Sequence, residues 1–178
     1  MAGENDWAEL LSELTTQSGE NLLALSADQA VMVVFLRHFG CTFCREAMAD
    51  IAKRKQEIEA IGAKIVLVHM SDNKTAEKYF KKFNLSGCDH ISDPECRFYA
   101  AFGLVKGTIN QLFGLQTWMR TIQTGVIKGY GWSGQIGDGF QMPGVFVLQN
   151  GEIKESFVHK MVSDRPDYEQ LARCCTLV

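Results

Sequence analysis

Two cysteines stand directly after a buried strand and at the start of a helix, and this order limits the fold more than any other feature of the chain. Residues 31–36 are six consecutive apolar side chains rich in β-branched and aromatic types, which indicates a strand buried on both faces. Cys41 and Cys44 follow, and residues 47–58 then carry apolar side chains at helical spacing. The sequence therefore predicts a strand, a CxxC pair and a helix in succession.

A cysteine in the first turn of a helix is placed to react as a thiolate. Unpaired backbone N–H groups and the positive end of the helix dipole stabilise the thiolate, and such placement lowers a cysteine pKa to roughly 3.5–7.5. His38 and Arg45 are candidate activators, because each would add positive charge beside the pair. The CxxC spacing lets Cys44 resolve a disulfide formed at Cys41. The alternatives, two buried small hydrophobes or half of a zinc site, fit the strand-to-helix setting less well.

The composition is that of a globular protein that needs no metal or cofactor to fold. With 178 residues, 46% of them hydrophobic, the chain is long enough to bury a sizeable core. We expect one domain over residues 1–178, with an N-terminal helical extension at 1–20 and an insertion at 103–141. A net charge of −3 without a basic patch argues against nucleic acid as a partner.

The cysteine count and the first residues bear on location. Six cysteines at irregular spacing do not form the framework of a disulfide-stapled secreted module. Cys88 and Cys96 are interpreted as structural thiols, and Cys174 and Cys175 as the frayed end of the last helix. The chain starts with acidic side chains where a secretory signal would carry a basic region and a long apolar core. We therefore expect a cytoplasmic protein, and the absence of any run of about 18 apolar residues predicts no membrane span.

The remaining elements alternate between strands and helices. Buried strands are predicted at 64–70 and 90–94, with a helix at 73–83 between them, so these units pair in parallel through right-handed crossovers. The Asn150-Gly151 pair between two apolar runs predicts a β-hairpin, and a helix closes the chain. The fold class is thus α/β, with a central mixed sheet and helices on both faces.

Two segments lie outside this alternation. Residues 6–14 predict a short amphipathic helix with Asp6 as its N-cap, and residues 22–25 lead into the first strand. Residues 109–122 predict an apolar helix followed by a glycine-rich loop, which is unusual at this length inside an α/β domain. This insertion is a lid, a dimer surface that would make the protein a homodimer, or an additional core helix.

This order of elements resembles the thioredoxin fold over roughly residues 20–173. More narrowly, three segments resemble the peroxiredoxin-like branch of the alkyl hydroperoxide reductase and thiol-specific antioxidant superfamily, namely residues 35–46, 91–95 and 142–147. The resemblance implies a three-layer thioredoxin-like fold and a thiol-dependent oxidoreductase.

The resemblance assigns roles residue by residue. Cys41 matches the nucleophilic first cysteine of a thioredoxin CxxC, and Cys44 matches the resolving one. Pro143 matches the cis-proline that lies against the cysteines in thioredoxins, and we expect its peptide bond to be cis. Met142 takes the preceding position, whose backbone pairs with an incoming peptide. Phe43, between the cysteines, is a second candidate substrate contact.

Three helper residues of these families are replaced. Peroxiredoxins supply an arginine from a later strand, and Pro143 stands at that position, which removes a donor for the peroxide oxygens. Their Thr or Ser before the reactive cysteine is also replaced, whichever cysteine is aligned. Thioredoxins use a buried Asp six residues before the first cysteine, where this chain has Phe35. Activation of Cys41 would then come mainly from the helix start, assisted by His38 or Arg45.

Three functions fit this sequence. The first is a thiol–disulfide oxidoreductase in which Cys41 attacks a protein disulfide and Cys44 releases the reduced product. The second is a thiol peroxidase in which a hydroperoxide oxidises one cysteine to a sulfenic acid that the other converts to a disulfide. Both need a cellular thiol as reductant. The third is a non-catalytic interaction module that docks a partner or a second copy through the region around Trp118.

Overall fold

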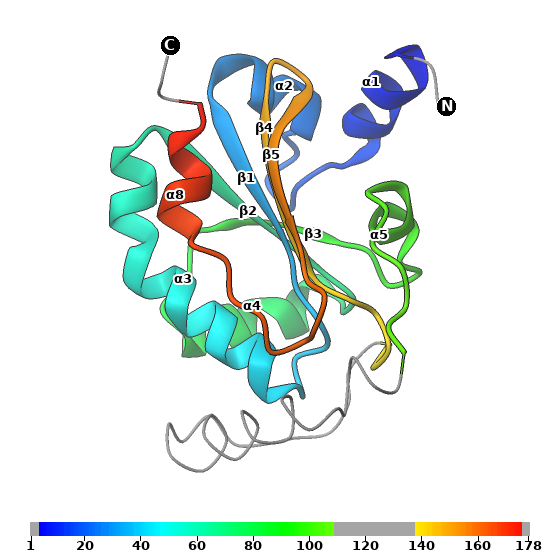
Figure 1. Cartoon of the computed structure of the whole chain (residues 1–178), viewed down its shortest axis with the longest axis vertical. Helices are drawn as coiled ribbons and strands as arrows, with labels where there is room; N and C mark the ends of the chain where they lie inside the picture. The colour runs from blue at the N-terminus through cyan, green and yellow to red at the C-terminus, as the bar shows by residue number, and fades with distance from the viewer. Residues whose placement is uncertain (1–3, 109–137, 176–178) are drawn as a thin grey trace.

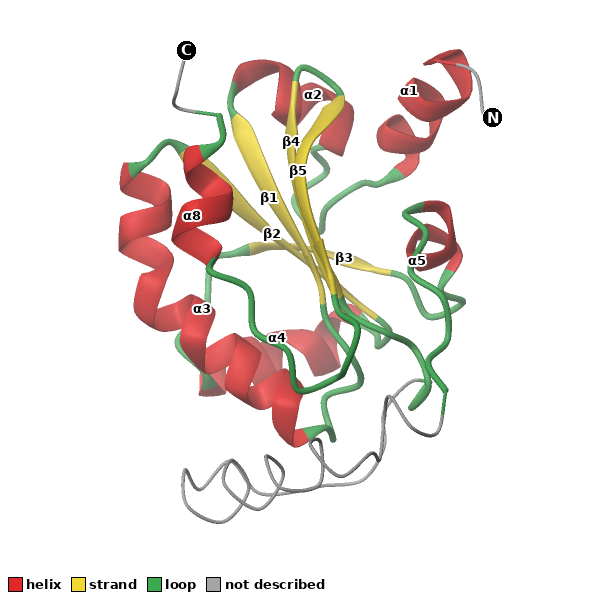
Figure 2. Cartoon of the chain, viewed as in Figure 1, coloured by secondary structure: helices red, strands yellow, loops and turns green. Residues whose placement is uncertain are grey.

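A central five-stranded sheet organises the structure. The computed structural model describes residues 4–108 and 138–175, and its strands lie in the order β3-β2-β1-β4-β5. Helices cover both faces of the sheet, as Figure 1 and Figure 2 show, so the arrangement is the expected α/β fold of three layers. Within the described ranges, no helix is both long and apolar enough to span a bilayer.

The sheet is mixed about its central strand, β1 (Ala30–Phe35). β1 runs parallel to β2 (Ala63–His69) and antiparallel to β4 (Gly144–Gln149). The two edges of the sheet are β3 (Asp89–Ser92) and β5 (Glu152–Val158). Every β1 side chain is buried, because this apolar strand lies between two helical layers.

Side chains of β1 alternate between two cores, because successive residues of a strand point to opposite faces. Met32 and Val34 face one core, and Val31, Val33 and Phe35 face the other. The helices packed on the first core are α3 (Thr42–Ala60), α4 (Asn73–Lys82) and α8 (Tyr168–Arg173). Those packed on the second core are α1 (Glu4–Glu13), α2 (Leu22–Asp28) and α5 (Arg97–Ala101).

The hairpin predicted at the Asn-Gly pair is confirmed. Asn150 and Gly151 join β4 to β5 with φ angles of 54° and 73°, the left-handed backbone that a two-residue hairpin turn requires. Trp7 Nε1 donates to the Gly151 carbonyl over 2.8 Å, which ties α1 to this turn. The N-terminal helix is therefore packed on the sheet.

The N-terminal region differs from the prediction in two ways. α1 begins at Glu4, so Asp6 lies inside the helix and is not its N-cap. Residues Leu22–Asp28 form α2, where the chain was expected to lead straight into the first strand. The Asn21 side chain caps this helix by accepting the Ala24 N–H over 2.9 Å.

The expected cis-proline is wrong. The described residues contain no cis peptide bond, so the bond that precedes Pro143 is trans. Pro143 directly precedes β4, and its carbonyl accepts the His159 N–H over 3.4 Å. Within the predicted insertion, residues 109–137, which include the region around Trp118, lie outside the described part of the chain. The division into an extension, one domain and an insertion stays a prediction.

Candidate active site

Cys41 and Cys44 lie at the start of α3, as the sequence predicts. Cys41 is the N-cap residue, with extended backbone angles of φ −76° and ψ 128°, and Cys44 lies in the first turn. The Cys41 N–H donates to the His38 carbonyl over 3.0 Å, in the turn that connects strand to helix. Both thiols are free and buried, with exposed fractions of 8% and 3%. In the described part of the chain, no group of three or more His, Cys, Asp or Glu side chains gathers as a metal site would require.

A guanidinium group lies directly against the first cysteine. Arg37 Nη1 donates to Cys41 Sγ over 2.9 Å. The same side chain donates from Nε to the Gln141 carbonyl over 3.1 Å, and from Nη2 to the Gly139 carbonyl. Arg37 is buried, so these contacts hold a cation beside the sulfur.

The second cysteine is held as a neutral thiol. Burial, and then the negative charge of Cys41, raise the pKa of Cys44 to about 12 against the opposing effects of Arg37 and Arg165. Cys44 Sγ donates to the Arg37 carbonyl over 3.3 Å. Cys44 therefore stays protonated near neutral pH.

The two predicted activators lie near the pair but differ in charge. Burial, and then the Arg37 guanidinium, lower the pKa of His38 to about 4, so its imidazole is uncharged near neutral pH. Arg45 is buried and donates from Nε to the Phe39 carbonyl over 3.1 Å. The positive charge that the sequence assigned to His38 is therefore absent near neutral pH.

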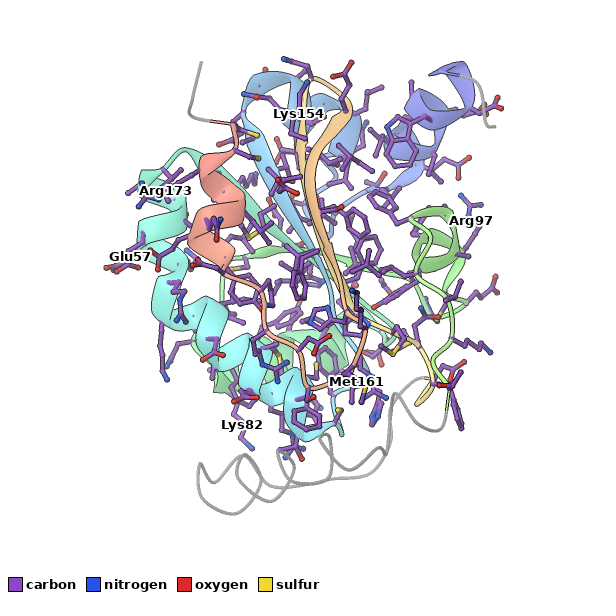
Figure 3. All side chains as sticks on the ribbon, in the orientation of Figure 1. Glu57, Lys82, Arg97, Lys154, Met161 and Arg173 are labelled. Carbon is purple, nitrogen blue, oxygen red and sulfur yellow. The ribbon has the colours of Figure 1, made fainter. Side chains whose placement is uncertain are left out.

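A partly buried ion pair between Arg165 and Glu46 lies against the start of α3 from another side. Arg165 Nη2 lies 2.6 Å from Glu46 Oε2 and donates to the Phe43 carbonyl over 2.9 Å. The guanidinium carbon of Arg165 lies 5.5 Å from the Phe43 ring centroid. Figure 3 shows Met161, in the same loop between β5 and α8, at the end of the molecule where α3 begins. Residues between and beside the cysteines are thus tied to the loop that precedes the last helix.

A pocket lies on the Cys44 side of the pair. Its wall includes Cys44, Phe43 and Pro143, together with the charged side chains of Arg37 and Arg165. The pocket therefore brings together three predicted site residues, Phe43, Cys44 and Pro143. Pro143 lies about a hundred positions further along the chain than the other two, and the peptide bond before it is trans.

The backbone groups of Met142 are hydrogen-bonded within the protein. It is buried, and its backbone N–H donates to the Val105 carbonyl over 3.4 Å. The Gln141 side chain donates from Nε2 to the Met142 carbonyl over 3.3 Å and to the Leu104 carbonyl over 2.7 Å. Both backbone groups of Met142 are therefore occupied, which leaves neither ready to pair with the peptide that the sequence analysis expected there.

Comparison with known protein families identifies the chain. Residues 50–163, more than half of its length, match the family model described as AhpC/TSA antioxidant enzyme. The chain belongs to the AhpC/TSA family. The matched residues begin after Cys44, so this match does not include the CxxC pair.

Two relatives and a solved structure are similar to this AhpC/TSA protein. A prostamide/prostaglandin F synthase of Salmo salar is 31% identical over 89% of this chain and 80% of its own length. Thioredoxin-like protein AAED1, a chloroplastic protein of Arabidopsis thaliana, is 25% identical over 83% of this chain, which spans 62% of that relative, less than two thirds. The crystal structure of peroxidoxin BcpB from Mycobacterium tuberculosis matches with a TM-score of 0.62 and 14% identity, covering 93% of this chain and 92% of that one. This AhpC/TSA protein therefore has a thioredoxin-like, peroxiredoxin-like fold.

The sequence did not lead us to expect Arg37 at the site of this AhpC/TSA protein. The only signal for it was position, a lone cation directly after six apolar residues and four positions before Cys41. Arg165 gave no local signal, because it lies 119 positions from the Glu46 that it pairs with. The fold brings both arginines to the cysteines.

His159, which lines the pocket of this AhpC/TSA protein, makes stability depend on pH. Burial, and then the neighbouring Arg165, lower the pKa of His159 to about 4, whereas an unfolded histidine has a pKa of about 6.5. Between these values the unfolded chain binds more protons, so a falling pH favours unfolding. We expect the His159 contribution to be complete above about pH 6.5, and the free energy of unfolding to decrease by about 2 kcal/mol between about pH 7 and pH 5 on its account.

The measurement is the free energy of urea unfolding at both pH values for the protein and for His159→Asn. Asparagine cannot take up the proton, so the variant is expected to lose about 2 kcal/mol less than the parent over this range. Other groups titrate equally in both proteins and cancel in the comparison. Equal losses in the two proteins would show that His159 does not titrate as its burial requires.

Proposed function

We propose that the protein reduces hydroperoxides, with Cys41 as the attacking sulfur and Cys44 as the resolving thiol. The observation that carries this proposal is the 2.9 Å hydrogen bond from Arg37 Nη1 to Cys41 Sγ. A guanidinium N–H there is placed to donate to the peroxide oxygens as negative charge develops on them. Membership of a family described as antioxidant enzymes supports the same class of reaction.

The burial of the site supports a small or slender substrate. Cys41 is 8% exposed, and the backbone groups of Met142 are occupied by Val105 and Gln141. A protein disulfide would require an exposed sulfur and a free backbone edge, whereas a hydroperoxide has only to reach the sulfur with its terminal oxygen. We therefore place hydroperoxides ahead of protein disulfides, although the sequence alone placed them second.

The proposed reaction has two steps at the protein. The Cys41 thiolate attacks the terminal oxygen of the hydroperoxide, the O–O bond breaks, and the alcohol leaves after taking a proton from solvent. Cys44 then attacks the sulfenic acid at Cys41, the S–O bond breaks, water leaves, and a disulfide forms. Two equivalents of an external thiol reduce this disulfide and become oxidised in turn.

Oxidation of Cys41 would prepare Cys44 for the second step. The negative charge of Cys41 is one of the causes that raise the pKa of Cys44. A sulfenic acid is neutral, so this cause disappears, while Arg37 and Arg165 continue to lower the pKa. The resolving thiol thus loses its proton more easily after the first step than before it.

Thiol–disulfide exchange is the second candidate function. Cys41 at the N-cap and Cys44 in the first turn have the arrangement by which a CxxC pair exchanges with a substrate disulfide. The two candidates share the attacking and the resolving cysteine and differ in the bond that Cys41 cleaves.

The substrate range and the location are part of the same proposal. One relative is named a prostamide/prostaglandin F synthase, so a prostaglandin-type substrate belongs among the compounds to test beside alkyl hydroperoxides. We propose the cytoplasm as the location, because a thiol pool there can return the disulfide to the reduced state.

Single-turnover kinetics distinguish the two candidates. The reduced protein is mixed with one equivalent of an alkyl hydroperoxide or of insulin, and the Cys41–Cys44 disulfide is followed by mass spectrometry after an acid quench. We expect the hydroperoxide to react at least about a hundredfold faster than it does with free cysteine, which lacks the guanidinium contact. A rate equal to that of free cysteine would contradict the proposal, and a fast reaction with insulin alone would favour exchange.

A further inference from the structure

Two adjacent thiols lie in contact beyond the end of α8. The Sγ atoms of Cys174 and Cys175 are 3.4 Å apart, and both residues are free thiols. Cys175 belongs to the core that α3 and α8 share, and its exposed fraction of 9% is close to the 8% of Cys41. Cys174 is partly exposed and packs against the same core. A dithiol of this kind is a redox group whose two sulfurs are already neighbours.

We propose that Cys174 and Cys175 are a second redox site, at which a hydroperoxide converts the two thiols to a disulfide. One sulfur, as its thiolate, attacks the terminal oxygen of the hydroperoxide, the O–O bond breaks, and the alcohol leaves. The neighbouring sulfur then attacks the sulfenic acid, displaces water and closes the disulfide. The thiols lose two electrons, the hydroperoxide gains them, and the products are the disulfide, the alcohol and water.

Burial and nearby charged groups act on Cys174. Burial, and then the contact with Cys175, raise the pKa of Cys174, so Cys174 keeps its proton. The Glu155 carboxylate strengthens this effect and the Lys154 ammonium opposes it. Figure 3 shows Lys154 at the same end of the molecule as Arg173, the last residue of α8. Cys174 is therefore the protonated member of the pair.

The second pair is separate from the first. Cys41 and Cys44 lie at the start of α3, whereas Figure 1 shows the end of α8 beside the opposite end of α3. A sulfenic acid at Cys41 is therefore out of reach of Cys175 in the same chain. The two sites oxidise independently, and each consumes its own equivalent of hydroperoxide.

A disulfide between neighbouring residues is strained. Consecutive Cα atoms are about 3.8 Å apart, whereas ordinary disulfides join Cα atoms roughly 4.4–6.8 Å apart. Strain makes a disulfide easier to reduce. The second site therefore returns to its dithiol form before the first when reductant is limiting.

The test uses the full chain carrying Cys41→Ser and Cys44→Ser, so that the first site cannot react. This variant keeps four cysteines, which are Cys88, Cys96, Cys174 and Cys175. After an excess of alkyl hydroperoxide, we expect the number of free thiols to fall from four to two, and the tryptic peptide that begins at Cys174 to lose two hydrogens. Dithiothreitol is expected to restore both thiols.

Further variants in the same background locate the reaction. Cys174→Ser is expected to abolish the two-hydrogen loss, and Cys88→Ser to leave it unchanged. Phenylarsine oxide, which bridges adjacent thiols, is expected to bind one equivalent per chain and to lose that binding in Cys174→Ser. The proposal is overturned if the peptide keeps both thiols, or if Cys175 carries a sulfinic or sulfonic acid instead of a disulfide. Because the background lacks the first cysteine pair, these results do not depend on the hydroperoxide activity proposed for Cys41.

Discussion

Cys41→Ser is expected to lower the second-order rate constant for hydroperoxide by about a thousandfold or more, because removing an activated nucleophile removes most of the catalysis that its neighbours supply. A serine hydroxyl is a much weaker nucleophile than a cysteine sulfur, so the Arg37 guanidinium that contacts Sγ at 2.9 Å would have no reactive sulfur beside it. The measurement is stopped-flow consumption of hydroperoxide by the reduced protein in a single turnover.

Cys44→Ser is the matched control for this prediction. Cys44 is a neutral thiol that donates to the Arg37 carbonyl, and a hydroxyl can make the same hydrogen bond, so the first step is expected to keep its rate. The variant is expected to stop after one turnover with a sulfenic acid at Cys41, which dimedone traps. If Cys44→Ser lost the first step and Cys41→Ser kept it, the roles of the two cysteines would be reversed.

Arg37→Met is expected to slow the first step by about 100- to 1,000-fold, the usual effect of removing one donor that stabilises charge in a transition state. Methionine fills a similar volume but offers neither charge nor N–H groups to Cys41. Arg37→Lys keeps the charge without the planar fork that also contacts Gln141 and Gly139, so an intermediate loss is expected. The same stopped-flow measurement applies to both variants.

Arg54→Met controls for the loss of an arginine elsewhere on the protein. Arg54 lies on α3, and its side chain is 42% exposed. Its Nε atom lies 3.5 Å from Glu169 Oε1. Exposed pairs contribute little to stability, so this variant is expected to keep the parent rate. Urea unfolding of each variant separates a damaged fold from a damaged site. A well-folded Arg37→Met with the parent rate would show that the contact with Cys41 is not catalytic.

The parts of the fold that local chemistry decides were predictable from the sequence. The apolar run before the cysteines fixed the central strand, because only a strand between two helical layers buries six successive apolar side chains. The Asn150-Gly151 pair fixed the hairpin through its left-handed backbone. α2 was missed because seven residues are too few to show a helical period, although its Asn21 cap is a usable signal.

The candidate site was predictable only in part, for a physical reason. The cysteines and their place at a helix start follow from local spacing. The role of Arg37 depends on carbonyl groups 104 and 102 positions away, which no local pattern reveals. The charge state of His38 and the trans isomer at Pro143 depend on burial and on tertiary packing, and both differ from what the sequence led us to expect.

The anchoring of Arg37 also sets when, during synthesis, the contacts around Cys41 can form. The Gln141 carbonyl that holds Arg37 lies 104 positions further along the chain, at the approach to β4. During synthesis Cys41 is therefore made well before the group that orients its arginine. In a nascent chain Arg37 lacks this anchor, and the site proposed for Cys41 is complete only once β4 has paired with β1.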